Sequence, residues 1–96
     1  MSLAPAADAV LKILVLLARQ VEPVPAATVA TSLGLPRSTT YRLLGSLVDQ
    51  GFVSYLPEEK RYGLGVVAFE LGSSYSRQMP LRRVAQPVLT RLVGAT

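Results

Sequence analysis

Residues 34–47 constrain the fold most, because they join a tight turn to the start of a two-faced helix. Gly34 allows the left-handed backbone conformation that a sharp turn between helices requires. Pro36 has a preset φ and lacks the N–H that the first turn of a helix leaves unpaired, so it suits a helix start. The helix that follows has one apolar face at helical spacing, made of Leu35, Leu43, Leu44 and Leu47.

The opposite face of this helix carries cations and hydroxyls, with no carboxylate before Asp49. Its residues are Arg37, Ser38, Tyr41, Arg42, Gly45 and Ser46. Such a face adds little to the stability of a folded chain, but it fits a polyanion. The pattern is typical of a recognition helix in the major groove of DNA. Gly45 costs about 1 kcal/mol in mid-helix, which predicts close approach of either the DNA backbone or the first helix.

Composition excludes several classes of function. Half of the 96 residues are hydrophobic, so one small domain with a core is expected. The chain has no Cys and no His, which removes disulfides, thiolate metal sites and the commonest general base. The six carboxylates form no paired acid–base motif, so we expect no enzyme, no cofactor and no metal. The net charge of +4 is compatible with nucleic acid.

The start of the chain and its apolar runs bear on location. The longest apolar run, residues 13–18, is too short to cross a membrane. Residues 1–7 lack the basic region of a secretory signal. We therefore expect a cytoplasmic protein of bacterial type that does not contact a membrane.

The first helix is predicted over residues 8–20, with Asp8 as its N-cap. Its apolar stripe consists of Val10, Ile13, Leu14, Leu17 and Val21. Leu11, Val15 and Leu16 exceed what one buried stripe needs. Two interpretations stay open: either the helix is buried on two sides, or its second face contacts a partner subunit.

The middle of the chain predicts a helix-turn-helix followed by a hairpin. After a loop at 22–25, a second helix starts at Pro25 or Ala26 and ends at 32 or 33, and the third runs from Pro36 to about Gln50, where Gly51 ends it. Residues 52–55 and 61–64 read as strands joined by a loop at 57–60, with Tyr62 and Leu64 in the core. The predicted fold is mainly α with a small β-hairpin, a winged helix-turn-helix followed by linker helices.

The last third of the chain predicts two more helices. Residues 65–78 form one, with a near-heptad stripe that includes Val67, Leu71 and Tyr75. Pro80 ends it, and a further helix begins at Leu81 with a kink at Pro87. Both exceed what a winged helix needs, which indicates a linker or dimerisation element. The expected dimerisation residues are Leu11, Val15, Val67, Leu71 and Tyr75.

The chain resembles the N-terminal DNA-binding region of the IclR family of bacterial transcriptional regulators. The matching pieces are residues 11–18, 34–44, 51–53, 61–65, 70–72, Leu81 and 85–89. Thr28 and Gln86 depart from the family pattern, which commonly has an acidic residue and an Arg there. The resemblance implies a winged helix-turn-helix at 8–64, with the helix-turn-helix at about 25–50 and the wing at 52–64.

The resemblance also implies partners. Residues 65–96 correspond to linker helices that lead into an effector-binding domain absent from this chain. A small-molecule effector is expected to bind only in that domain. The family forms homodimers, often paired as tetramers, on partly palindromic promoter sites in double-stranded DNA. With the residues above, it indicates sequence-specific DNA binding by helix 36–50. The alternative is a protein–protein interaction module, but a docking helix more often shows an exposed apolar cluster.

The candidate DNA-binding residues are Arg37, Ser38, Thr39, Tyr41, Arg42, Ser46, Lys60 and Arg61. Arg37 can bind guanine or a phosphate, and Ser38 can donate to a phosphate at the helix N-terminus. The simpler alternatives are a solvated Arg37, a Ser38 that only caps the helix, and an Arg42 that pairs with Asp49. For the wing cations, the alternative to a groove or phosphate contact is a solvated hairpin tip.

Overall fold

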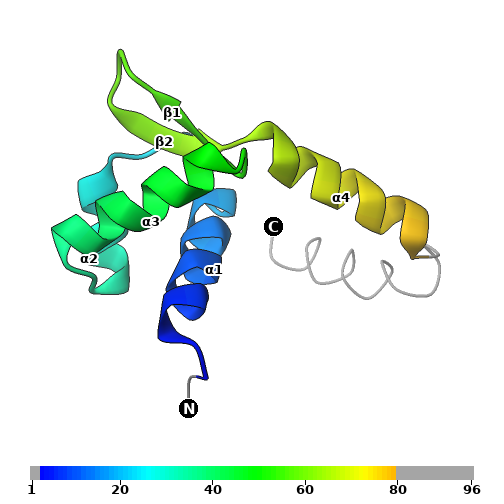
Figure 1. Ribbon diagram of the computed structural model, residues 1–96. Coiled ribbons are helices and arrows are strands. Elements are labelled where there is room, and N and C mark those ends of the chain that lie inside the picture. Colours follow the sequence, from blue (N-terminus) through cyan, green and yellow to red (C-terminus); the bar gives the residue numbers. More distant parts are fainter. Residues whose placement is uncertain (1–2, 80–96) are drawn as a thin grey trace, which may run out of the picture.

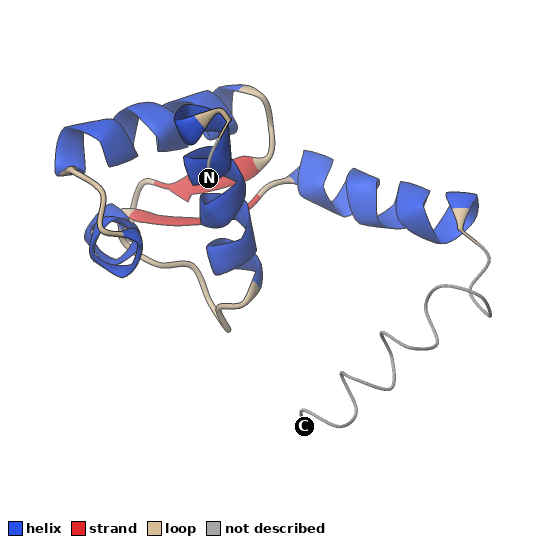
Figure 2. Ribbon diagram, turned by 90° about the horizontal axis from the view of Figure 1, so that it is seen from below, coloured by secondary structure: helices blue, strands red, loops and turns tan. Residues whose placement is uncertain are grey.

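The computed structural model describes residues 3–79. Along the chain it has α1 (Pro5–Ala18), α2 (Ala26–Leu33), α3 (Arg37–Asp49), β1 (Val53–Leu56), β2 (Arg61–Leu64) and α4 (Val66–Gln78) (Figure 1). The first three helices pack together beside the hairpin, and α4 projects away from them in both views (Figures 1 and 2). This arrangement confirms the predicted winged helix-turn-helix. The predicted helix from Leu81, with its kink at Pro87, lies outside the described residues.

The core forms where α1, α2, α3 and β1 meet. Ile13, Val29 and Leu44 are fully buried at its centre, because each lies on the inward face of its helix at helical spacing. The buried apolar cluster comprises Ile13, Leu17, Ala26, Val29, Leu44, Leu47 and Val53. Thr40 is also fully buried, and its hydroxyl donates to the carbonyl of Pro36 at 3.0 Å. Thr40 thus lies on the inward face of α3, with Leu44 and Leu47.

The prediction that Asp8 caps the first helix is wrong. The helix begins at Pro5 with Ala4 as its N-cap, and the Asp8 amide already donates to the carbonyl of Ala4 at 2.9 Å. Pro5 has the φ that a first helical residue needs, and the neighbouring alanines have the highest helix propensity. The helix also ends earlier than predicted, at Ala18, so Val21 is fully exposed and does not belong to the apolar stripe.

Of the two interpretations of α1, burial on both sides is wrong for the described part of the chain. Leu11 remains 59% exposed and Val15 remains 47% exposed, although Leu16 is half-buried. The second face of α1 is therefore an open apolar surface.

The predicted turn and helix end are confirmed. Gly34 has a φ of +66° directly after α2, and the Leu35 amide donates to the carbonyl of Ala30 at 3.0 Å. Gly51 has a φ of +85° just beyond α3. Both backbone conformations favour glycine, so these two residues fix where α2 and α3 end.

The hairpin is antiparallel, with Val53 opposite Leu64 and Tyr55 opposite Tyr62. Its first strand begins one residue later than predicted. Tyr62 is half-buried and packs against the core, but Leu64 is 44% exposed, so its predicted place in the core is wrong. Leu64 is the last residue of β2, where the chain turns out towards α4 and leaves the side chain incompletely covered.

The loop before α2 pairs with the hairpin, which the sequence reading did not predict. Val24 and Tyr62 exchange two backbone hydrogen bonds, of 2.9 and 2.7 Å. Arg61 donates from Nη1 to the carbonyl of Pro23 at 3.1 Å. The 22–25 loop therefore lies along the outer edge of β2 and holds the wing against the helices.

Backbone hydrogen bonds attach α4 to the base of the hairpin. The Gly65 amide donates to the Phe52 carbonyl at 2.8 Å, and the Val67 amide donates to the Gly51 carbonyl at 3.0 Å. A Cβ atom on Gly65 would overlap the Gly51 carbonyl oxygen and lie 3.0 Å from the Val53 nitrogen. The close approach requires glycine at position 65. Beyond this junction, α4 has no fully buried residue.

Candidate nucleic-acid interface

The exposed face of α3 carries most of the predicted DNA-binding residues. Tyr41 is 52% exposed, Thr39 is half-buried, and the remaining members are exposed: Arg37, Ser38, Arg42 and Ser46. The buried face of the same helix holds Thr40, Leu44 and Leu47. The helix therefore presents its cations and hydroxyls outward on a firmly packed support.

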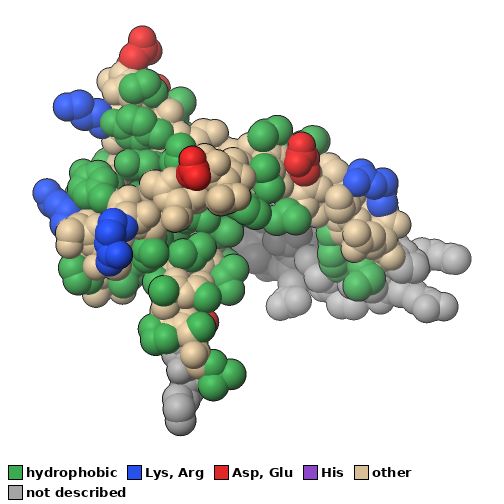
Figure 3. All heavy atoms as spheres, in the orientation of Figure 1, with side chains coloured by type: hydrophobic (Ala, Val, Ile, Leu, Met, Phe, Trp, Pro, Cys, Tyr) green, Lys and Arg blue, Asp and Glu red, His purple; other side chains and the backbone are tan. Residues whose placement is uncertain are grey.

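The competing intramolecular roles for these side chains do not occur in residues 3–79. α3 begins after Pro36 without a side-chain capping hydrogen bond, so Ser38 is not its cap. No ion pair joins Arg42 to Asp49, and neither Arg37 nor Arg42 has a hydrogen-bonded partner in this part of the chain. Figure 3 shows basic side chains over the left end of α3, where the helix begins, and an acidic one over its other end.

Within residues 3–79, Arg61 is the wing cation with a hydrogen-bonded partner, and Lys60 has none. Lys60 is exposed at the hairpin turn, with a φ of +55°, and follows the exposed Glu58 and Glu59. Arg61 is half-buried and donates to the Pro23 carbonyl. Arg61, which pairs with Leu56 beside the hairpin turn, thus ties that end of β2 to the loop before α2, and contact of Lys60 or Arg61 with DNA stays a prediction.

A tyrosine cluster comprises Tyr55 and Tyr62 of the wing, with Tyr41 of α3 near enough to affect Tyr62 electrostatically. The rings of Tyr55 and Tyr62 pack with centroids 4.8 Å apart and planes tilted by 43°. Burial raises the pKa of the Tyr62 phenol, and electrostatic interaction with Tyr55 and then with Tyr41 adds to the increase. The sequence reading missed this cluster. Its signal was the one tyrosine in each predicted strand, because residues opposite each other in an antiparallel pair lie on the same face of the sheet.

Comparison with known proteins identifies this architecture. Residues 6–57 match the model of the IclR helix-turn-helix domain, which is more than half of the chain. The chain belongs to the IclR family. The predicted resemblance is thereby confirmed, and so is the prediction that the chain is not an enzyme, because proteins of this family are transcriptional regulators. Its winged helix-turn-helix is a DNA-binding module of transcription regulation.

Two relatives and one solved structure illustrate the similarity. The chain is 36% identical to the transcriptional repressor IclR of Escherichia coli over 83 residues, which cover 86% of this chain and 30% of that protein. It is 39% identical over 92 residues to the uncharacterized HTH-type transcriptional regulator RhmR of Escherichia coli, covering 96% and 35%. The crystal structure of an IclR transcriptional regulator from Alicyclobacillus acidocaldarius superposes with a TM-score of 0.77 at 28% identity, covering 83% and 32%.

This IclR-family chain therefore spans about a third of the length of these relatives. In residues 3–79, no helix is long and apolar enough to span a membrane. The same part of the chain has no group of three or more carboxylate, His or Cys side chains that could hold a metal ion.

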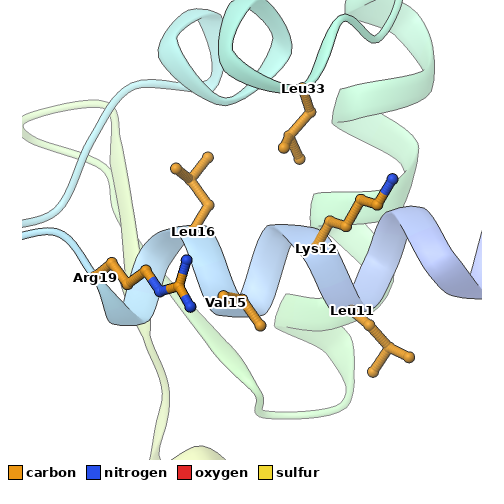
Figure 4. A pocket seen from close by; sticks show the side chains of 6 residues that line it. All are labelled: Leu11, Lys12, Val15, Leu16, Arg19 and Leu33. Carbon is orange, nitrogen blue, oxygen red and sulfur yellow. The ribbon is translucent and has the colours of Figure 1, made fainter. Parts of the chain in front are cut away.

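The predicted dimerisation residues occupy two exposed surfaces. On α1, Leu11 and Val15 line a groove of about 360 Å³, into which Leu16 and Leu33 point from either side while Lys12 and Arg19 flank it (Figure 4). On α4, Leu71 is 57% exposed and Tyr75 is 44% exposed. Val67 differs, because it is half-buried and its Cγ2 lies against Gly51.

Proposed function

We propose that the chain binds operator DNA sequence-specifically, with α3 in the major groove, as the DNA-binding part of a bacterial transcriptional regulator. The observation that carries this proposal is the exposed face of α3. It combines two guanidinium groups, free of partners in the described residues, with hydroxyls, and it has no carboxylate before Asp49. A repressor among the relatives, the Escherichia coli IclR protein, agrees with this role.

Each side chain on this face has a role that its position supports. Arg37 lies in the first turn of α3 and can bind guanine bidentately. Arg42 lies about 8 Å further along the axis, at 1.5 Å per residue, and contacts a second base or a phosphate. The hydroxyls of Ser38, Thr39, Tyr41 and Ser46 donate to phosphates, and Lys60 and Arg61 of the wing meet the flanking backbone or the minor groove.

Selection from a random duplex library tests this proposal. We expect the 96-residue chain to enrich a half-site or a partly palindromic site, and we expect the Arg37→Ala/Arg42→Ala variant to enrich none. Binding should fall steeply with salt, because phosphate contacts release counterions.

The control is Arg77→Ala, which removes a guanidinium group from α4, away from the exposed face of α3. It should enrich the same site as the parent chain. If neither the parent nor any variant enriches a sequence, and all bind DNA equally, the assignment of α3 is refuted and the protein-docking alternative gains support.

We further propose that two copies of the chain bind the two halves of the site as a homodimer, with pairing into tetramers in the longer protein. The support is two exposed apolar surfaces, one with Leu11 and Val15 on α1 and one with Leu71 and Tyr75 on α4, whose side chains are all at least 44% exposed. Large exposed apolar side chains grouped on one surface mark protein interfaces. Val67 contributes the part of its side chain that Gly51 does not cover.

Sedimentation of the free chain and of its DNA complex tests the dimer. Leu11→Asp or Leu71→Asp should leave the chain folded but reduce binding to the full site to that of a single half-site. Val66→Asp is the control, since Val66 is 65% exposed on α4 but lies off the Val67–Leu71–Tyr75 stripe. Equal behaviour of all three variants would contradict the assigned surface.

The remaining assignments rest on the family. We propose that residues 8–64 form the DNA-binding unit and that residues 65–96 link it to an effector-binding domain. That domain would lie in the part of the relatives that this chain does not span, and it would take the small-molecule effector. A cytoplasmic location follows from operator DNA as the partner.

A further inference from the structure

Gly45 in the middle of α3 has no explanation within the fold. Among residues 3–79, a Cβ atom built at this position meets no atom within 4 Å beyond the adjoining backbone of α3, so close packing against α1, one of the two predicted explanations, is wrong. Its φ is not positive either, because Gly34 and Gly51 are the positive-φ glycines of the described residues. Glycine inside a helix is destabilising relative to alanine. Neither packing nor backbone conformation accounts for this cost.

The position of Gly45 on α3 points outward, between two electrostatically different halves. It lies on the exposed face, three residues after Arg42 and four before Asp49. At 1.5 Å per residue, it is about 12 Å along the axis from Arg37. The cations thus precede Gly45, and the carboxylate and the C-terminal end of the helix follow it.

This charge distribution orients α3 on a polyanion. Phosphates attract the guanidinium groups of Arg37 and Arg42. They repel Asp49 and the negative end of the helix dipole. The helix therefore enters the groove with its first turns and rises out of it towards its C-terminus. Gly45 lies where the helix passes the rim of the groove, which is where the sugar–phosphate backbone runs.

We propose that Gly45 is a positioning residue for DNA recognition, because its missing side chain lets the sugar–phosphate backbone pack directly against α3. This inference rests on the proposed function. A side chain at position 45 would hold the helix away from the duplex and withdraw Arg37 and Arg42 from the groove. The stability lost in the free protein is thus traded for close contact in the complex.

The test combines two substitutions with two measurements. Gly45→Ala and Gly45→Leu are compared with the parent chain by thermal unfolding and by anisotropy titration of a labelled duplex. The duplex is the sequence that the parent chain enriches from a random library. We expect Gly45→Ala to melt at a higher temperature and yet to bind about tenfold more weakly, equivalent to about 1.4 kcal/mol. Gly45→Leu should bind more weakly still.

Salt dependence separates a steric loss from an electrostatic one. Neither Gly45 variant removes a charge, so the slope of log affinity against log salt should stay at the parent value. Arg42→Ala should reduce that slope by about one phosphate contact. A Gly45→Ala variant whose slope falls like that of Arg42→Ala overturns the steric proposal.

Gly72→Ala is the matched control, because Gly72 also lies inside a helix, and a Cβ built there meets no atom within 4 Å among the described residues outside the adjoining backbone of α4. It should raise the melting temperature and leave affinity unchanged; an equal loss of affinity would overturn the proposal. The proposal for Gly45 is also overturned if Gly45→Ala binds DNA as tightly as the parent chain while Arg42→Ala binds weakly. In that case the proposed function survives. If the parent chain enriches no sequence and Arg42→Ala binds library DNA as the parent does, both fail.

Discussion

The junction between the hairpin and α4 makes a sharp prediction about Gly65→Ala. The added methyl group would overlap the carbonyl oxygen of Gly51 and lie 3.0 Å from the nitrogen of Val53. Both obstacles are backbone atoms, so a side-chain rotation cannot relieve the overlap. The φ of −101° and ψ of 179° at Gly65 are ordinary extended values, and alanine adopts them without strain. The cost therefore comes from displacement of α4 alone.

The magnitude follows from the contacts that this displacement breaks. Restoring normal separations of 3.5 Å or more requires a shift of about 1 Å. Such a shift weakens the Gly65–Phe52 and Val67–Gly51 hydrogen bonds, now 2.8 and 3.0 Å long. Each is worth about 1 kcal/mol net, and part of the Val67 contact with Gly51 is lost as well. The expected total is about 2–3 kcal/mol, or roughly 10–20 °C in melting temperature for a domain of this size.

Thermal unfolding followed by circular dichroism, with amide exchange at Val67, measures this effect. Gly72→Ala provides the comparison, since in the described part of the chain the added methyl group meets no atom within 4 Å outside the adjoining backbone of α4. This change should stabilise α4 by about 0.5–1 kcal/mol. The two variants should therefore move in opposite directions. If Gly65→Ala melts with the parent chain and protects the Val67 amide equally, the reasoning about this junction is refuted.

Three other substitutions test the core, the interface and the wing. Thr40→Val should cost less than about 1 kcal/mol in urea unfolding, because the Pro36 carbonyl keeps the Thr40 amide at 3.0 Å; a larger loss would contradict this. Arg37→Ala should weaken the free energy of DNA binding by roughly 1–3 kcal/mol and relax the sequence preference at one base pair. Equal weakening of binding to all sequences would instead make Arg37 a phosphate contact. Because burial raises the Tyr62 pKa, its contribution to stability is complete below the unfolded pKa of about 10 and is lost as pH rises through the folded pKa. Tyr62→Phe should therefore reduce the fall in melting temperature between pH 9 and 12. If the variant and the parent chain show the same pH dependence, the raised pKa of Tyr62 is contradicted.

The parts of the fold that the sequence predicted correctly depend on local signals. Gly34 and Gly51 have positive φ, and Pro36 lies directly before α3, which begins one residue later than predicted. Each acts through its own backbone, so a single sequence suffices to interpret it. Helical spacing alone likewise predicted the two faces of α3. The exposure of Tyr41 and the burial of Thr40 agree with this helical period.

The parts that escaped prediction depend on residues far apart in the chain. Val24 pairs with Tyr62, and nothing in the composition of the 22–25 loop reveals that partner. The start of α1 was predicted wrongly for another reason. Pro5 and Asp8 are both residues that favour a helix start, and the two alanines between them favour helix, so the helix begins at the earlier one. Within the candidate site, the bond from Arg61 to the Pro23 carbonyl could not be predicted, since it needs the position of the loop.

The backbone bonds at the base of the hairpin have a consequence for how the wing can diverge among related proteins. Because Phe52 and Gly65, and likewise Gly51 and Val67, are joined directly, the recognition helix and α4 keep their mutual geometry whatever lies at the far end of the hairpin. The exposed residues 57–60 close that end. The entropy of closing a loop grows only slowly with its length. Insertions at the tip can therefore change the length and charge of the wing while leaving the relative position of α3 and α4 unchanged.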